Sequence, residues 1–210
     1  MRRVIAFDVN ETLLDLRALD GLFGGAERRQ AWFAQLLQLV FVGLITGRDI
    51  SFPAASETAL GIVGGGPDPD DLAAAMRRLP LHADVAPALD RLREGGLTLC
   101  ALTNSPLDSV SEALEHAGIA DRFEAIVSAE QAGRLKPAPE PYRLAAERFG
   151  VEVGDVTLVA CHAWDCSGAL AAGCEAAFVH RPGMVPAFVG GVPRVVGDDL
   201  GEVAAHLLVR

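Results

Sequence analysis

Short, continuous apolar runs recur along the chain and are bounded by polar or turn-forming residues. Three of them, at residues 4–9, 97–102 and 156–161, contain almost no polar side chains. This pattern is typical of strands buried on both faces of a parallel sheet, since a half-exposed strand alternates apolar and polar residues. Residues 176–179 and a weaker run around 123–127 fit the same role. The pattern therefore predicts a parallel sheet.

Helical patterns with recognisable ends lie between these runs. Ser105 is expected to cap a helix that has Pro106 at its first position and Gly118 as its stop. Two more helical segments end at glycines, residues 140–149 at Gly150 and residues 167–172 at Gly173. Strand and helix therefore alternate, which predicts an α/β fold with a doubly wound parallel sheet and right-handed crossovers.

Residues 16–79 break this alternation. Apolar side chains recur there at i, i+3, i+4 and i+7 with no strand beside them, as in an amphipathic helix. These side chains are Trp32, Phe33, Leu36, Leu37, Val40, Phe41 and Leu44. In the turn-rich stretch that follows, Asp68 or Asp70 can cap a helix through Arg78. We expect most of the apolar stripe to be core and a minority of it to roof a pocket.

These patterns divide the chain into two expected domains. Residues 1–15 and 80–210 form an α/β core, and residues 16–79 form a small helical cap inserted after the first strand. An insertion at this point lies over the carboxyl ends of the strands, where ligands bind in such sheets.

Composition narrows the classes of partner. Of the 210 residues, 50% are hydrophobic and 22% are charged. The hydrophobic share is enough to form a sizeable core. The net charge of −10, from 18 basic and 28 acidic residues, argues against binding to nucleic acid or to anionic membranes. The most apolar stretch, residues 31–47, falls short of the ~20 residues that a membrane-spanning helix needs. It is instead a candidate contact of a homodimer.

Cysteine usage and the start of the chain indicate the compartment. Cys100, Cys161, Cys166 and Cys174 lie in apolar runs and are expected to be reduced and buried. Cys-His-x-x-x-Cys at 161–166 lacks the paired spacing of a zinc site, so no metal is expected there. The start of the chain has only four apolar residues before Asp8, fewer than a signal peptide has. We therefore expect a cytoplasmic protein.

Polar residues follow the ends of the predicted strands. Asp8 ends the first run, Thr103 and Asn104 end the second, and His162 and Asp165 follow the third. Because the carboxyl ends of parallel strands meet at the same edge of a sheet, we expect these side chains to converge.

Lys136 is a candidate to join them, because Pro137 and Pro139 stiffen its loop before a helix. Two carboxylates in one site, Asp8 and Asp165, repel, and at least one pKa would rise unless a cation lies between them. Lys136 or Mg²⁺ can supply that cation.

Four ordered motifs carry a family resemblance over essentially the whole chain. They are Phe-Asp-Val-Asn-Glu-Thr-Leu-Leu-Asp at 7–15, Leu-Thr-Asn-Ser at 102–105, Leu-Lys-Pro at 135–137 and Ala-Trp-Asp at 163–165. The set resembles the haloacid dehalogenase superfamily. His162-Ala163-Trp164-Asp165, with Lys136-Pro137 followed by Tyr142, is most similar to the L-2-haloacid dehalogenases (type II). The resemblance implies a Rossmann-like core, a helical cap, a small anionic substrate and no cofactor.

The resemblance also implies roles for individual residues. Asp8 would be the nucleophile, since a carboxylate can displace halide from an sp³ carbon and form an ester that water later cleaves. Lys136 would keep it ionised. The other implied roles are water activation for Asp165, a hydrogen bond at the nucleophile loop for Thr12, and binding of the substrate carboxylate for Thr103 with Asn104.

Two further positions have both a functional and a structural interpretation. Arg29 resembles the cap arginine that meets the substrate carboxylate or departing halide, with a surface arginine as the alternative. Tyr142, the only tyrosine, aligns with a family site position, with helix packing as the alternative. The amides at the start of the helix after Ser105 suit an anion on their own account.

Position 10 distinguishes dehalogenase from phosphatase. Phosphatases of this superfamily have an aspartate there that protonates the leaving oxygen, whereas this chain has Asn10, which cannot donate a proton as an acid. Halide leaves without a proton. We therefore predict a hydrolytic dehalogenase of short 2-haloalkanoic acids. A Mg²⁺-dependent small-molecule phosphatase and a non-catalytic binding protein on the same fold are the alternatives.

The sequence also departs from the type II pattern. That family usually has an aromatic residue where this chain has Asn10, glycine in place of Glu11, and serine and asparagine in place of Ala160 and His162. His162 is expected to hydrogen-bond to Asp165 or water, or to titrate as a base near neutral pH.

Overall fold

Six strands form one parallel sheet in the part of the chain that the computed structural model describes, residues 3–209. The ends of the predicted core domain, residues 1–2 and 210, lie outside the described residues. The strands are β1 (Val4–Phe7), β2 (Thr98–Thr103), β3 (Ala125–Ser128), β4 (Val156–Ala160), β5 (Glu175–Val179) and β6 (Val195–Gly197). Their order is β3-β2-β1-β4-β5-β6. The predicted doubly wound α/β sheet is confirmed.

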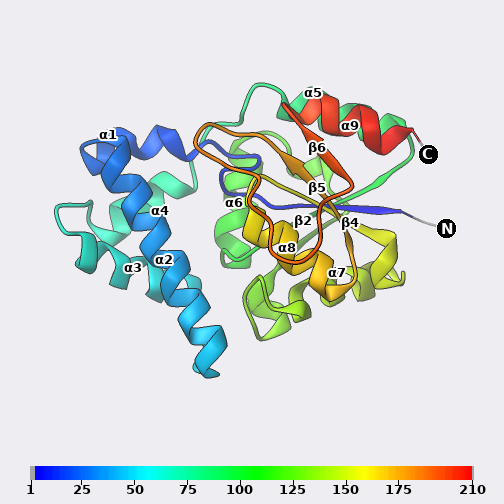
Figure 1. Cartoon of the computed structure of the whole chain (residues 1–210). Coiled ribbons are helices and arrows are strands. Elements are labelled where there is room, and N and C mark those ends of the chain that lie inside the picture. Colours follow the sequence, from blue (N-terminus) through cyan, green and yellow to red (C-terminus); the bar gives the residue numbers. More distant parts are fainter. Residues whose placement is uncertain (1–2, 210) are drawn as a thin grey trace.

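The apolar strands are buried because helices cover both faces of the sheet (Figure 1). These helices are α5 (Val85–Glu94), α6 (Leu107–His116), α7 (Pro139–Phe149), α8 (Ala163–Ala172) and α9 (Leu200–Leu208). Along β1, Ile5 and Phe7 pack into the core cluster that contains buried residues of α5, α6 and α9. Val4 and Ala6 point to the other face and pack with residues of α7 and α8. Since neither face of β1 meets water, its sequence is a continuous apolar run.

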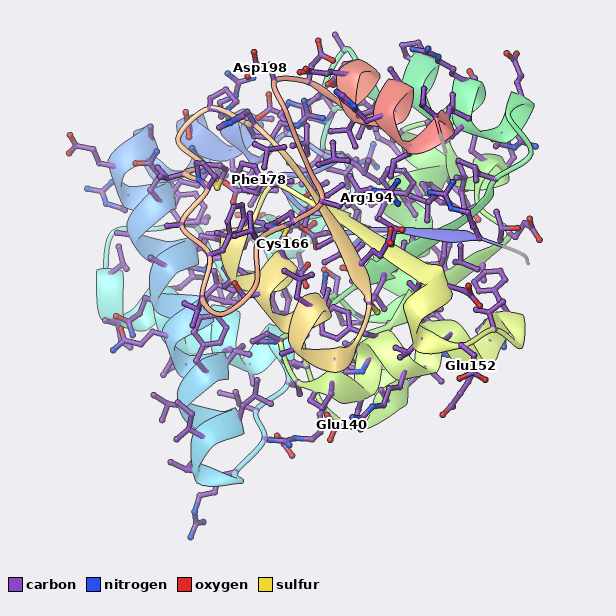
Figure 2. All side chains as sticks on the ribbon, turned by 45° about the vertical axis from the view of Figure 1, so that its right-hand side comes forward. Glu140, Glu152, Cys166, Phe178, Arg194 and Asp198 are labelled. Carbon is purple, nitrogen blue, oxygen red and sulfur yellow. The ribbon has the colours of Figure 1, made fainter. Side chains whose placement is uncertain are left out.

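Side chains fill the layers on both sides of the sheet (Figure 2). Cys166 on α8 and Phe178 on β5 are wholly buried, whereas Glu152 and Arg194 lie on the surface. All four cysteines are buried and free of disulfides, as expected. Within residues 3–209, no helix combines the length and apolar character needed to cross a membrane.

Helices make up the regular structure of the described segment 16–79. They are the 3-10 helix η1 (Leu16–Leu19), α1 (Asp20–Phe23), α2 (Ala26–Thr46), α3 (Phe52–Val63) and α4 (Pro69–Met76). They lie together beside the edge of the sheet toward which β1 runs (Figure 1). Trp32 on α2 packs against Phe23 and Phe33 and donates its indole N–H to the Ser56 carbonyl of α3 at 3.2 Å. The division into a core and a cap at residues 16–79 stays a prediction.

Some predicted helix ends differ from the structure. Ser105 does not cap α6: Pro106 is the N-cap, and the Ser105 hydroxyl instead accepts a hydrogen bond from Asn10. The predicted cap is therefore wrong, because a tertiary contact takes the side chain. Asp68 does cap α4, which ends at Met76 rather than Arg78. Helix α8 begins at Ala163, before the predicted start at 167.

Candidate active site

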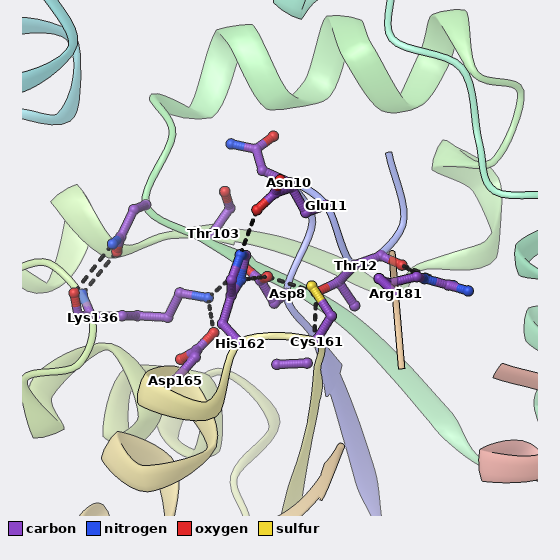
Figure 3. Close-up of polar contacts among 12 residues, drawn as sticks. Asp8, Asn10, Glu11, Thr12, Thr103, Lys136, Cys161, His162, Asp165 and Arg181 are labelled. Atoms are coloured by element: carbon purple, nitrogen blue, oxygen red, sulfur yellow. Dashed lines mark hydrogen bonds and ion pairs between the residues drawn. The ribbon is translucent and has the colours of Figure 1, made fainter. Parts of the chain in front are cut away.

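Asp8 lies at the carboxyl edge of the sheet, where strand order reverses. It follows β1, whose neighbours β2 and β4 lead into the two halves of the sheet. Its backbone N–H donates to the Val159 carbonyl at 3.0 Å, which extends the pairing of β1 with β4. Lys136, His162 and Asp165 converge on it from segments far apart in the sequence (Figure 3).

Lys136 lies between the two carboxylates. Its Nζ is 2.9 Å from Oδ1 of Asp8 and 2.6 Å from Oδ2 of Asp165. The same ammonium donates to the Leu102 carbonyl at 2.9 Å, so all three donors are used. Burial alone would lower the pKa of Lys136, but the charges of Asp165 and Asp8 outweigh it and raise that pKa. Lys136 therefore stays a cation that balances two buried anions.

The two carboxylates of this site differ in pKa. Burial alone would raise the pKa of Asp8, but the charge of Lys136 and the hydrogen bond with His162 hold it well below its usual range. In Asp165, burial and the charge of Asp8 outweigh Lys136 and raise the pKa of the carboxyl. Of the pair, Asp8 is the more strongly held as an anion.

Thr12 fixes the orientation of the Asp8 carboxylate. Its hydroxyl donates to Oδ2 of Asp8 at 2.7 Å and accepts from the backbone N–H of Cys161 at 3.0 Å. The same Oδ2 lies 3.0 Å from Nδ1 of His162. Asp8 thus has Lys136 on one oxygen and both Thr12 and His162 on the other.

Asp165 and Tyr142 form a buried pair behind Lys136. The Tyr142 hydroxyl donates to Oδ1 of Asp165 at 2.6 Å, and burial together with the charge of Asp165 raises the pKa of Tyr142. Asp165 is wholly buried, and each of its oxygens has a protein partner, Tyr142 on one and Lys136 on the other. Activation of water by Asp165 stays a prediction.

Thr103 and Asn104 are turned toward the backbone. The Thr103 hydroxyl accepts from the N–H of Ser105 at 3.1 Å, and the Asn104 amide bonds to the backbone of Lys136. Their placement supports the loops around Asp8. Binding of a substrate carboxylate by these two side chains stays a prediction.

Glu11 and Arg29 extend the site toward the helices of residues 16–79. Oε2 of Glu11 lies 2.9 Å from Nε2 of His162, and Oε1 lies 3.3 Å from Nη1 of Arg29. Nε of Arg29 is 2.6 Å from Oδ1 of Asp20. Arg29 is therefore buried within an ion-pair network rather than a surface arginine. Sequence reasoning noticed Glu11 as a departure but did not name it as a site residue.

A cavity of about 290 Å³ opens between these helices and the start of α6. Its buried polar lining residues are Asn10 and Ser105, joined by a 3.1 Å hydrogen bond from Asn10 Nδ2 to Ser105 Oγ. Trp32 also lines it, in agreement with the expectation that a minority of the apolar stripe roofs a pocket. Ser105 was expected only as a helix cap. Arg29 does not line this cavity.

Comparison with known proteins gives the family. A family model of haloacid dehalogenase-like hydrolases matches residues 2–173. The chain belongs to the haloacid dehalogenase-like hydrolase family. The predicted superfamily is therefore confirmed, and the chain is a hydrolase of this family.

Individual relatives of this hydrolase are similar over nearly their full length. (S)-2-haloacid dehalogenase 2 of Pseudomonas sp. (strain CBS-3) is 30% identical, over 98% of this chain and 91% of the relative. Haloacetate dehalogenase H-2 of Moraxella sp. (strain B) is 28% identical, over 90% of each chain. The structure of L-2-haloacid dehalogenase from Xanthobacter autotrophicus with chloropropionic acid covalently bound is 24% identical, with a TM-score of 0.90 over 99% of this chain and 98% of that one. This last likeness shows the fold.

Mg²⁺, which the phosphatase alternative requires, does not fit the residues of this haloacid dehalogenase-like hydrolase. The Lys136 ammonium lies between Asp8 and Asp165, the position that a cation shared by both carboxylates would take. Within residues 3–209, no three His, Cys, Asp or Glu side chains are grouped so that they could hold a metal ion.

Proposed function

We propose that this protein hydrolyses the carbon–halogen bond of 2-haloalkanoic acids and gives a 2-hydroxy acid and halide through an ester on Asp8. The observation that carries the proposal is the Asp8 carboxylate held as an anion against Lys136, with Asn10 where a phosphatase needs an acid. The relatives named as (S)-2-haloacid and haloacetate dehalogenases support the same substrate class.

In the first step an Asp8 oxygen attacks Cα of the acid and halide leaves. The new C–O bond replaces the carbon–halogen bond, and the halide takes the bonding electron pair, so no proton donor is needed at position 10. Lys136 and Thr12 hold the attacking carboxylate in one orientation, which reduces the entropy cost of reaching the transition state.

The carboxylate of the substrate binds at the start of α6 in this proposal. The first turn of a helix has backbone N–H groups without intrahelical partners, and the helix dipole favours an anion there. Ser105, Pro106 and Ser109 from this region line the cavity. Apolar side chains also line the cavity, Leu72 and Met76 of α4 among them, and the alkyl part of the acid packs against them in this proposal.

In the second step water attacks Cγ of the Asp8 ester. Negative charge then develops on an Asp8 oxygen, and the Lys136 ammonium, 2.9 Å from Oδ1 in the resting site, stabilises it. The ester cleaves at the Cγ–O bond, so the product hydroxyl oxygen comes from Asp8 and the water oxygen stays in the carboxylate.

A halide-release screen tests this proposal. Incubation with 2-chloropropionate, 2-bromopropionate and fluoroacetate is expected to release halide, and Asp8→Asn is expected to abolish release. Asp121→Asn, at an exposed surface position, is the matched control and should retain activity. Absence of halide from a broad panel, with phosphate released from phosphomonoesters instead, would contradict the proposal.

A further inference from the structure

His162 connects two carboxylates beside the nucleophile. Its Nδ1 lies 3.0 Å from Oδ2 of Asp8, and its Nε2 lies 2.9 Å from Oε2 of Glu11 (Figure 3). The ring is buried between aromatic side chains, with centroids 5.7 Å from Phe33 and 5.4 Å from Trp164. Both ring nitrogens and the ring plane are therefore fixed relative to Asp8.

Glu11 reaches His162 from an unfavourable backbone conformation. Its φ of 61° lies in the left-handed region, and no other non-glycine residue of the described chain has a positive φ. This conformation strains a residue with a Cβ, and glycine would avoid the strain. Arg29, itself held by Asp20, pairs with the second oxygen of Glu11. A strained, buried glutamate supported in this way orients the imidazole.

The other polar groups beside Asp8 are engaged with protein partners. Lys136 is a cation whose pKa is raised and whose three donors are all engaged. Asp165 is wholly buried against Lys136 and Tyr142. Thr12 is engaged with Asp8 and Cys161. His162 also contacts Asp8, and its neutral imidazole has a ring nitrogen that can accept a proton.

We propose that His162, oriented by Glu11, is the general base that takes the proton of water during hydrolysis of the Asp8 ester, an inference that rests on the proposed function. In the type II pattern an asparagine stands at this position and a glycine at position 11. The pair therefore gives this chain an imidazole beside Asp8 where the pattern has an amide.

The change of charge on Asp8 controls the protonation of His162. In the resting enzyme the ring lies between Asp8 and Glu11; burial works to lower the pKa of His162, but its contacts with Cys161, Asp8 and Glu11 raise it well above its usual value. Attack on the substrate converts the Asp8 carboxylate into a neutral ester. His162 then loses one of its anionic partners, which lowers its pKa and favours release of its proton.

The proton balance of the hydrolysis follows from this state. Neutral Nδ1 takes a proton from water as the water oxygen bonds to Cγ of Asp8. The same proton passes to the departing alkoxide oxygen as the Cγ–O bond breaks, which gives the hydroxy acid and protonated Asp8. Asp8 then returns a proton to His162. The sum is one haloacid and one water converted to hydroxy acid, halide and one proton.

Charged groups face His162 from each neighbouring segment. Asp8 follows β1, Glu11 lies in the loop after it, and Arg29 on α2 lies behind Glu11. Lys136 reaches the same Asp8 carboxylate from the loop before α7. The pH dependence of ester hydrolysis is therefore expected to follow the ionisation of His162, whose pKa is set by Glu11 and by the other charged groups around it.

Single-turnover kinetics with 2-chloropropionate test the inference. His162→Asn keeps a hydrogen-bonding amide but cannot take a proton; it is expected to release about one halide per enzyme and then hydrolyse the ester at least about 10²-fold more slowly. Intact-protein mass would detect the accumulated ester. Glu11→Gln is expected to leave halide release intact, slow ester hydrolysis and shift its pH profile. Glu27→Gln, an exposed carboxylate on α2, is the control and should match the wild type.

The outcomes separate the inference from the proposed function. Halide release by the wild type, with the ester hydrolysed at the wild-type rate in both His162→Asn and His162→Gln, overturns the inference alone. Absence of halide release by the wild type overturns the proposed function and this inference with it. Recovery of ester hydrolysis in His162→Gly by added imidazole supports a proton-transfer role for His162. This rescue experiment tests the inference even if the His162→Asn variant does not fold.

Discussion

The side-chain amide of Asn104 binds both backbone polar groups of Lys136. Its Oδ1 accepts from the Lys136 N–H at 2.8 Å, and its Nδ2 donates to the Lys136 carbonyl at 3.2 Å. Asn104 follows β2, so this pair fastens the lysine loop to the carboxyl edge of the sheet. By fixing the backbone of Lys136, Asn104 helps to position the ammonium group that balances the charges of Asp8 and Asp165.

Asn104→Ala is expected to lose both hydrogen bonds and to displace the Lys136 ammonium. A displacement of the order of 1 Å in a catalytic group can cost about 10²-fold in rate, so the halide-release rate should fall by roughly that factor. Asn104→Asp keeps the acceptor for the Lys136 N–H and should lose less. Equal rates for the wild type and Asn104→Ala would show that this anchor does not matter.

Lys136→Met is expected to inactivate the enzyme and to destabilise it. Two buried carboxylates would lose their shared cation, and breaking a buried ion pair costs about 3–5 kcal/mol. Protonation of the carboxylates relieves their repulsion, so the loss should shrink as the pH falls from about 7 to about 4. Urea unfolding across this range measures it. A loss that stays constant with pH would contradict the buried-pair account.

The stabilisation by His162 is expected to depend on pH. Because its folded pKa is raised above the usual ~6.5, its ionisation stabilises the fold fully below about pH 6.5 and less as the pH rises through the raised value. The difference in free energy of unfolding between the wild type and His162→Asn should therefore shrink from about pH 6 to about pH 9. The exposed His206→Asn serves as the control. A difference that grows with pH would mean that the folded pKa is lowered instead.

Gly168→Ala is expected to destabilise the protein, because a larger side chain at this position would clash with the loop that carries Lys136. A Cβ at Gly168, on α8, would lie 2.5 Å from Cβ of Pro137 and 2.6 Å from the Tyr142 hydroxyl. Overpacking of this kind costs about 1–3 kcal/mol. The control is Gly61→Ala on α3, where nothing lies within 4 Å and helix propensity should stabilise by up to ~1 kcal/mol. Thermal unfolding compares the stabilities of the two variants with that of the wild type. An increase in stability for both variants would contradict the close packing around Gly168.

The sequence predicted the strands of the sheet well where burial decides the pattern. β1 reads as a continuous apolar run because both of its faces are covered. The sequence pattern did not predict β6, because it is a three-residue strand at the edge of the sheet and its Val196 is exposed. The Ser105 cap was wrong because Asn10, distant in sequence, takes its hydroxyl. A local sequence pattern cannot show that a residue distant in sequence will hydrogen-bond to a candidate capping side chain.

The site was predictable in outline and not in its connections. Strand ends placed Asp8, His162 and Asp165 at one edge of the sheet, since that follows from topology. The contact of Glu11 with His162 depends on a left-handed backbone at Glu11, which the residue type does not favour. Likewise, the ion pairs of Arg29 depend on how α2 lies against the loop after β1.

The most direct test of the central claim is a single turnover in heavy-oxygen water, with enzyme in excess over 2-chloropropionate. If Asp8 forms the ester and water attacks its Cγ, the heavy oxygen is found in the peptide that contains Asp8, and the first hydroxy acid formed is unlabelled. Label in the hydroxy acid with none in Asp8 would show that water attacks the substrate directly, and would contradict a covalent role for Asp8.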